Sequence, residues 1–221
     1  MGIRKVEFTK GEYYHVFNRG VDKRSIFTNK KQLYFFFKRL RTLNTTDSSK
    51  YFDNKRNKLK DQDITGEGDS LVTIIAYCLL PNHFHLLLKQ NADTGISQFM
   101  QRLGTSYTKF FNQEEDRSGS LFQGKFKATH LSGDYALSTV SAYVNLNFKH
   151  HKIDPEKQPV KTSLFEYFDE ELGDRICSQT EIDAIIAESG DLSDYKNTIK
   201  EASISFADNK GLDLSFEDFE F

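Results

Sequence analysis

Two histidines, His83 and His85, lie two residues apart in the stretch LVTIIAYCLLPNHFHLLLK, residues 71–89. Apolar runs rich in β-branched and aromatic residues flank Pro81-Asn82 and predict two strands joined by a tight turn. Side chains alternate across a strand, so both imidazoles project from the same face of this hairpin. Such a pair can hold a metal ion, although it is also often two half-exposed polar residues that alternate with core residues.

A tyrosine and an asparagine later in the chain could complete such a site. Residues 134–151, DYALSTVSAYVNLNFKHH, carry apolar residues at helical spacing and predict a helix with Asp134 as N-cap. Tyr143 and Asn147 are four residues apart, so they share a face of that helix. A helix packed on the hairpin would bring this face to the two histidines. Core packing is the alternative for Tyr143, because apolar residues surround it.

Two imidazoles, an amide oxygen and a phenol together suit the cleavage of a phosphodiester. The first three would give a divalent ion its protein ligands, compatible with Mg²⁺ or Mn²⁺, although imidazole more often accompanies Zn²⁺. The ion would polarise a scissile phosphate. The Tyr143 hydroxyl would attack phosphorus, form a covalent phosphotyrosine and expel a 3′-hydroxyl, which conserves the bond for rejoining.

Other tyrosines and histidines compete for these roles. Tyr107 lies in a predicted helix at residues 95–111, where the Met/Leu/Phe face around it favours packing. His15 lies in a predicted first strand, where a surface or hydrogen-bonded histidine is favoured. His150 and His151 are expected at the end of an element, without a catalytic role. A closed zinc site is disfavoured, because no cysteine pair or further histidine cluster supplies four ligands.

The order of the predicted elements indicates the fold class. A strand, a helix, two strands, a helix, a strand and a helix follow one another. Four antiparallel strands covered by helices form an α+β sandwich of the ferredoxin-like, split βαβ kind. The predicted strands lie at residues 13–19, in the hairpin 71–89 and at 121–131, and the predicted helices lie at 30–43, 95–111 and 134–151.

Charge is distributed unevenly along the 221 residues. Residues 1–160 carry 25 basic and 16 acidic side chains, whereas residues 161–221 carry 5 and 16. A basic body favours a partner with a phosphate backbone. We therefore predict a catalytic domain at 1–153 with a mobile insertion at about 44–70, followed by an acidic, partly helical C-terminal extension at 154–221.

The composition also bears on the compartment. No apolar run approaches the roughly 20 residues that a membrane helix needs, and the N-terminus lacks the apolar core of a signal peptide. Cys78 and Cys177 are too few and too far apart for a disulfide framework. The expectation is a cytoplasmic protein with no membrane contact, associated with the nucleoid when it binds DNA.

Basic residues in the second half of the body are candidates for DNA contact. Lys125 and Lys127 alternate with apolar residues in the predicted strand at 121–131. Lysines beside an aromatic residue on a strand suit a nucleic-acid surface and equally suit a solvent-facing edge strand. Arg102 in the preceding helix and Arg117 in the turn after it complete the predicted set.

These motifs, in this order, resemble those of a known family. LPNHFHLLLK resembles the His-hydrophobic-His motif of the single-tyrosine HUH transposases, small insertion-sequence enzymes that cut and join single-stranded DNA. AYVNLN resembles their catalytic-tyrosine helix. MQRLGTSYTKFFNQ followed by GSLFQGKFKATHL is most similar to the branch called REP-associated tyrosine transposases (RAYT). The resemblance covers roughly residues 13–151.

By position, the resemblance implies that His83 and His85 are metal ligands, that Tyr143 is the nucleophile and that Asn147 completes the metal site. It further implies Mg²⁺ or Mn²⁺, single-stranded DNA with hairpin-forming ends, a 5′-phosphotyrosine intermediate and frequently a homodimer. The insertion and the acidic extension depart from the family pattern. The alternative is a non-catalytic protein that binds single-stranded or hairpin nucleic acid, because four-stranded sheets with exposed aromatic residues also bind single strands by stacking.

Overall fold

The computed structural model describes residues 6–47, 70–133, 136–169 and 173–207. The predicted insertion falls largely outside these ranges, and the predicted N-cap Asp134 falls outside them entirely. In chain order the elements are β1 (Tyr13–Arg19), the 3₁₀ turn η1 (Val21–Lys23), α1 (Lys30–Thr42), β2 (Val72–Leu80), β3 (His83–Gln90), α3 (Gly95–Glu114), β4 (Lys127–His130), α4 (Leu137–Asn145), α5 (Asn147–His150), β5 (Lys161–Thr162), the 3₁₀ turn η3 (Ser163–Tyr167), α6 (Gln179–Glu188) and α7 (Leu192–Ala207).

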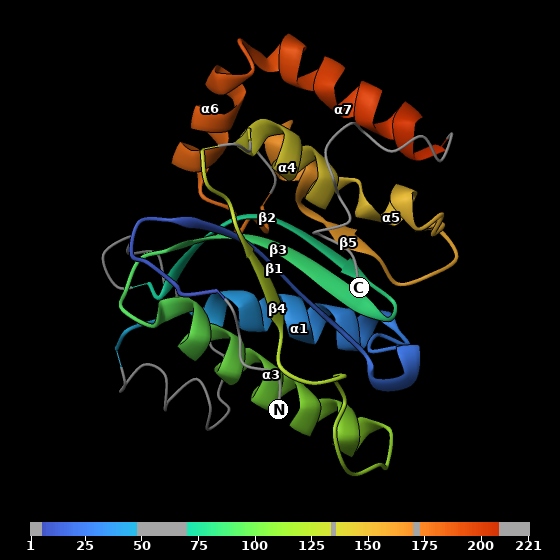
Figure 1. Cartoon of the computed structure of the whole chain (residues 1–221). Helices are drawn as coiled ribbons and strands as arrows, with labels where there is room; N and C mark the ends of the chain where they lie inside the picture. Colours follow the sequence, from blue (N-terminus) through green and yellow to red (C-terminus); the bar gives the residue numbers. More distant parts are fainter. Residues whose placement is uncertain (1–5, 48–69, 134–135, 170–172, 208–221) are drawn as a thin grey trace.

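These elements form three layers (Figure 1). The sheet lies in the middle, with α1 and α3 on one face and α4, α5, α6 and α7 on the other (Figure 1). Within the described residues the sheet has five strands in the order β4-β1-β3-β2-β5, each antiparallel to its neighbours.

The first four strands confirm the predicted split βαβ arrangement. The segment with α1 connects β1 to β2, and the segment with α3 connects β3 to β4 across the same face of the sheet (Figure 1). The fifth strand was not predicted. It consists of Lys161 and Thr162 from the acidic extension, which pair with β2 at the edge that a four-stranded sheet would leave exposed.

The face under α1 and α3 holds an aromatic core. Phe36 of α1 contacts Phe84 of β3 and Tyr107 of α3, with ring centroids 5.1 and 4.9 Å away. A glycine is required where α3 begins, because a Cβ on Gly95 would lie 2.2 Å from the Leu71 carbonyl oxygen. Since Phe84 points into this core, its neighbours on either side in β3 point to the opposite face.

The helix predicted at residues 134–151 is two helices in the structure. Leu146, with φ −100° and ψ 8°, separates α4 from α5, which begins at Asn147. Hydrogen bonding continues across the break, since the Leu146 N–H donates to the Ala142 carbonyl at 3.0 Å and the Leu146 carbonyl accepts from the Lys149 N–H at 2.8 Å. Tyr143 and Asn147 both remain fully buried.

Part of the acidic extension packs against the sheet. The register of β2 shifts at Ile75, and two carbonyls at this bulge accept hydrogen bonds from the extension. The Ser178 N–H donates to the Ile74 carbonyl and the Tyr167 hydroxyl donates to the Ile75 carbonyl, each at 2.9 Å. Ser178 caps α6, since its side chain accepts a hydrogen bond from the Glu181 N–H. The boundary between residues 153 and 154 stays a prediction.

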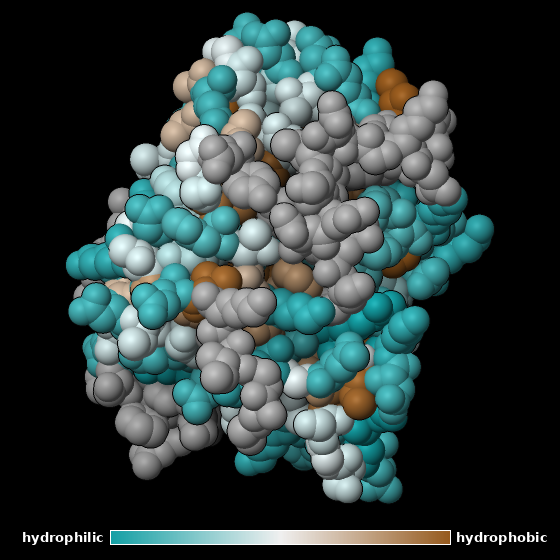
Figure 2. Space-filling model, viewed as in Figure 1, coloured by the Kyte–Doolittle hydropathy of each residue, from teal (hydrophilic) through white to brown (hydrophobic). Residues whose placement is uncertain are grey.

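Hydrophobic side chains are sparse on the face of the molecule in Figure 2. They reach the surface there as small, separate patches among hydrophilic residues. Among the described helices, none is long and apolar enough to cross a membrane.

Candidate metal and nucleophile site

The two histidines of the hairpin lie on the face of β3 that α4 covers. The antiparallel register places His85 opposite Phe17 of β1 and Cys78 of β2, and it places His83 opposite Arg19. The two imidazole rings are nearly perpendicular, at 79°, with centroids 5.1 Å apart. His83 is 2% exposed and His85 is 1% exposed. They are therefore buried together, unlike the half-exposed pair of the alternative interpretation.

His15 of β1 contacts His85 directly. His15 Nε2 lies 2.9 Å from His85 Nδ1, and the two rings stack with centroids 5.0 Å apart. In such a pair one ring nitrogen donates and the other accepts. When His85 Nδ1 carries the proton, the lone pair on Nε2 can bind a metal ion. His15 is thus a buried, hydrogen-bonded histidine that orients its neighbour.

His83 lies between two asparagines. Its Nδ1 is 2.6 Å from Asn82 Oδ1, an oxygen that can only accept, so Nδ1 carries the proton and Nε2 the lone pair. The Asn82 amide is oriented by its Nδ2, which donates to the Lys23 carbonyl at 3.4 Å. On the other side of the ring, His83 Nε2 faces Asn147 Oδ1 at 3.4 Å. Two acceptors therefore face each other.

This arrangement tests whether the residues fit a metal ion. A cation between His83 Nε2 and Asn147 Oδ1 would satisfy both lone pairs. Without a cation, the Asn147 amide would turn over and donate through Nδ2, an atom that has no hydrogen-bond partner among the described residues. The donor set of two imidazole nitrogens and one amide oxygen fits a divalent ion.

Burial keeps the three imidazoles neutral. Desolvation lowers the pKa of His15 and of His83 to about 3, and for His83 the neighbouring His151 adds to the effect. Desolvation, followed by the nearby His15, also holds the pKa of His85 well below its usual value. All three rings are therefore unprotonated at pH 7, as metal ligation requires.

Tyr143 of α4 faces the same histidines. Its ring stands edge-on to those of His85 and His15, with centroids 5.9 and 5.7 Å away. Tyr107 instead packs in the core under α1 and α3, where its hydroxyl donates to the Ile26 carbonyl and burial raises its pKa. The structure brings Tyr143, and not Tyr107, to the histidines.

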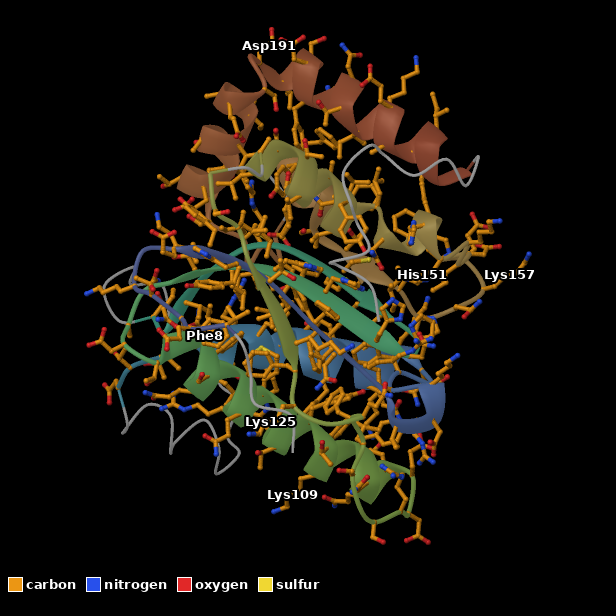
Figure 3. The ribbon with its side chains drawn as sticks, viewed as in Figure 1. Phe8, Lys109, Lys125, His151, Lys157 and Asp191 are labelled. Carbon is orange, nitrogen blue, oxygen red and sulfur yellow. The ribbon has the colours of Figure 1, made fainter. Side chains whose placement is uncertain are left out.

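His151 lies at the end of α5 (Figure 3) and also approaches the site. Metal-ligating atoms of His83, His85 and His151 lie within 4.8 Å of one another. The His151 ring stands at 81° to that of His83 with centroids 4.5 Å apart. From the sequence we expected no role for His151. The signal available was its spacing of four residues from Asn147, which places both on one helix face.

Of the four predicted DNA-binding residues, the two arginines are hydrogen-bonded to loop carbonyls and the two lysines are exposed to solvent. Arg102 donates to the Thr45 carbonyl at 2.6 Å, and Arg117 donates to the Ser120 carbonyl at 2.9 Å, so both guanidinium groups hold loops in place. Lys125 and Lys127 are exposed. The register pairs Lys127 with Phe17, on the same face as His85. DNA contact by these four residues stays a prediction.

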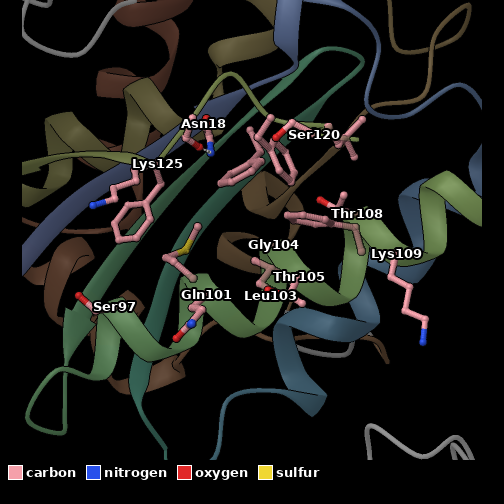
Figure 4. Close-up of a pocket in the computed structure, with 17 residues that line it drawn as sticks. Asn18, Ser97, Gln101, Leu103, Gly104, Thr105, Thr108, Lys109, Ser120 and Lys125 are labelled. Atoms are coloured by element: carbon pink, nitrogen blue, oxygen red, sulfur yellow. Dashed lines mark hydrogen bonds between the residues drawn. The ribbon is translucent and has the colours of Figure 1, made fainter. Parts of the chain in front are cut away.

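A pocket of about 860 Å³ lies on the other face of the sheet, between α3 and the segment at residues 120–126 (Figure 4). Lys109 and Lys125 line it, and the described lining residues include no carboxylate. Asn18 donates to the Gly124 carbonyl at 3.2 Å along its wall (Figure 4). Phe84 contributes to the lining, and it points away from the face that carries His83 and His85.

Comparison with known proteins identifies the family. Residues 10–147, well over half of the chain, match the family described as IS200-like transposases. Among solved structures, a REP-associated tyrosine transposase bound to a REP hairpin is similar at 14% sequence identity, with 75% of this chain and 84% of that chain covered and a TM-score of 0.47. No curated protein matches the sequence.

Proposed function

The chain belongs to the IS200-like transposase family, and from this premise we propose that it cuts and rejoins single-stranded DNA near hairpins through a 5′-phosphotyrosine on Tyr143. One observation carries the proposal. Tyr143 and Asn147, from two consecutive helices, meet His83 and His85 on one buried face of the sheet. The assignment to the RAYT branch, a cytoplasmic or nucleoid location and a homodimer belong to the same proposal.

In the proposed reaction the Tyr143 oxygen attacks a phosphodiester phosphorus. A new oxygen–phosphorus bond forms, the bond to the 3′ oxygen breaks, and the strand end leaves as a 3′-hydroxyl. The phenol loses one proton as the new bond forms and the leaving 3′ oxygen gains one, so the step is proton-neutral overall. The His150 ring, with its centroid 6.0 Å from that of Tyr143, is a candidate to accept the phenolic proton. Rejoining reverses the step with a second 3′-hydroxyl, so no external energy source is needed.

His83, His85 and Asn147 would hold a divalent ion, Mg²⁺ or Mn²⁺. When bound, the ion supplies Lewis-acid polarisation of the scissile phosphate. The protein supplies the orientation: Asn82 fixes the His83 ring and His15 fixes the His85 ring, so that each presents Nε2.

Cations near this face suit the DNA backbone. Arg19 lies opposite His83 in the β1–β3 pair, and its charge contributes to lowering the pKa of that histidine. Lys127 lies further along the same face, on the edge strand β4. We assign phosphate contacts to these two residues.

The burial of Tyr143 constrains this proposal. Its side chain has no exposed surface, whereas attack requires that its hydroxyl reach a phosphate, so a local rearrangement must expose the hydroxyl before cleavage. The same burial favours the second candidate function. A transposase relative that binds hairpin DNA without cutting it would keep Tyr143 permanently as a packing residue.

A covalent-adduct assay distinguishes the two functions. Labelled single-stranded hairpin DNA would be incubated with the full chain and Mg²⁺ or Mn²⁺, then separated on a denaturing gel. We expect an adduct that chelator abolishes and that Tyr143→Phe lacks. Tyr107→Phe is the matched control, since it also removes a buried helical hydroxyl, and it should retain the adduct. Hairpin binding with no adduct under any condition would support the non-cutting function and overturn the cleavage proposal.

A further inference from the structure

The backbone of His151 is fixed at the exposed end of the face that carries His83 and His85. Its N–H donates to the Asn147 carbonyl at 3.1 Å, which makes it the residue after the last turn of α5. The chain then leaves the helix, because Lys152 has φ +54° and the Ile153 N–H donates back to the Phe148 carbonyl at 2.8 Å. The His151 ring therefore stands beside that of His83 at the solvent side of the site.

We propose that His151 is a further metal ligand, so that three imidazoles and the Asn147 amide oxygen form the site and the protein binds Mn²⁺ in preference to Mg²⁺. This inference rests on the proposed function for the location of the metal, and it adds a ligand and a metal preference. It is carried by the mutual approach of the ligating atoms of His83, His85 and His151, all within 4.8 Å.

The distances allow one ion to be shared. Metal–nitrogen bonds of about 2.1 Å place two ligands of one tetrahedral ion about 3.4 Å apart. His83 and His85 are fixed by hydrogen bonds to Asn82 and His15. His151 is exposed, so its side chain can rotate inward by the small difference without repacking the core.

The chemistry of the donor set decides which ion is preferred. Mg²⁺ favours oxygen ligands and retains several waters, whereas imidazole nitrogen suits transition ions. A site of two imidazoles and one amide oxygen would prefer transition ions over Mg²⁺ only moderately. A third imidazole, placed one helical turn beyond Asn147, raises the share of nitrogen ligands and moves the site toward Mn²⁺ and other transition ions.

Metal binding can be measured without cleavage. Metal-free full-length protein would be titrated with Mn²⁺ and with Mg²⁺ by isothermal calorimetry, and Co²⁺ absorption would report the nitrogen ligands. We expect His151→Ala to weaken Mn²⁺ binding by about 10-fold or more, to change the Co²⁺ spectrum, and to leave Mg²⁺ binding within about 2-fold. His130→Ala is the matched control, because His130 is exposed on β4 and pairs with Glu12 at 3.1 Å.

The outcomes separate this inference from the proposed function. If the wild type binds Mn²⁺ and His151→Ala binds it equally well, His151 is no ligand, and the site of His83, His85 and Asn147 stands. If the wild type binds neither ion, or if His83→Ala binds as the wild type does, the proposed metal site itself fails. Because His151 is exposed, its replacement should not unfold the protein, and circular dichroism checks this.

Discussion

Acidification should destabilise this protein through its buried histidines, and His15 allows the effect to be measured at one residue. His15 is fully buried in β1, where desolvation lowers its pKa to about 3. In the unfolded chain its pKa is about 6.5. The folded state therefore binds this proton less readily than the unfolded state. The stability that depends on neutral His15 is fully present above pH 6.5 and is lost as the pH falls from about 6.5 toward 3.

The magnitude follows from the two pKa values of His15. At pH 5 the histidine is protonated in the unfolded chain and neutral in the folded one. This pH lies about 1.5 units below the unfolded pKa. At about 1.4 kcal/mol per unit, this lowers the free energy of unfolding by about 2 kcal/mol between pH 7 and pH 5. That is a large share of the roughly 5–15 kcal/mol by which a typical domain is stable.

Urea unfolding of metal-free protein at pH 7 and at pH 5, for the wild type and for His15→Gln, isolates this contribution. Glutamine cannot take up the proton, yet it can still hydrogen-bond to His85. Between the two pH values, the wild type should lose about 2 kcal/mol more unfolding free energy than the variant. His130→Gln, which replaces an exposed histidine on β4, should lose as much as the wild type.

An equal loss in the wild type and in His15→Gln would refute the reasoning. It would mean that His15 takes up its proton within the fold, by a rearrangement that gives it access to water. A loss in His130→Gln that is smaller than in the wild type would show that exposed histidines carry part of the pH dependence.

Two further predictions concern DNA binding and the acidic extension. Lys127→Glu should weaken single-stranded DNA binding, measured by fluorescence anisotropy. The slope of the log binding constant against log salt should fall by about 0.7 for each phosphate that the side chain no longer neutralises. Lys196→Glu on α7 is the control, and a slope in Lys127→Glu that is unchanged and equal to the control's would place the DNA elsewhere. Glu166 is 2% exposed and accepts hydrogen bonds from the Tyr77 hydroxyl and the Cys177 N–H, both at 2.8 Å. Glu166→Ala should cost about 3 kcal/mol in urea unfolding because it leaves buried donors unpaired, and a cost below about 1 kcal/mol would mean that the extension does not stabilise the sheet.

Local features of the site could be predicted from the sequence because they depend on the backbone within a few residues. Strand alternation is sufficient to place His83 and His85 on one face, and the hairpin follows from two β-rich runs around Pro81-Asn82. The spacing of Tyr143 and Asn147 likewise places both on one helical side, even though the helix is interrupted between them. Together with the order of the elements, these patterns predicted the split βαβ sandwich.

Contacts between distant segments required the tertiary structure, since they depend on register and packing that no local period encodes. His15 meets His85 because β1 pairs with β3 in one register, and a shift of one residue would turn His15 to the other face. His151 meets His83 because α5 ends at His150 above β3, which places the next residue beside the His83 ring. The fifth strand exists because two residues of the extension pair with the outer edge of β2, which the first four strands leave unpaired. The sequence alone determined which residues could do the chemistry, and the packing of the helices on the sheet decided which of them meet.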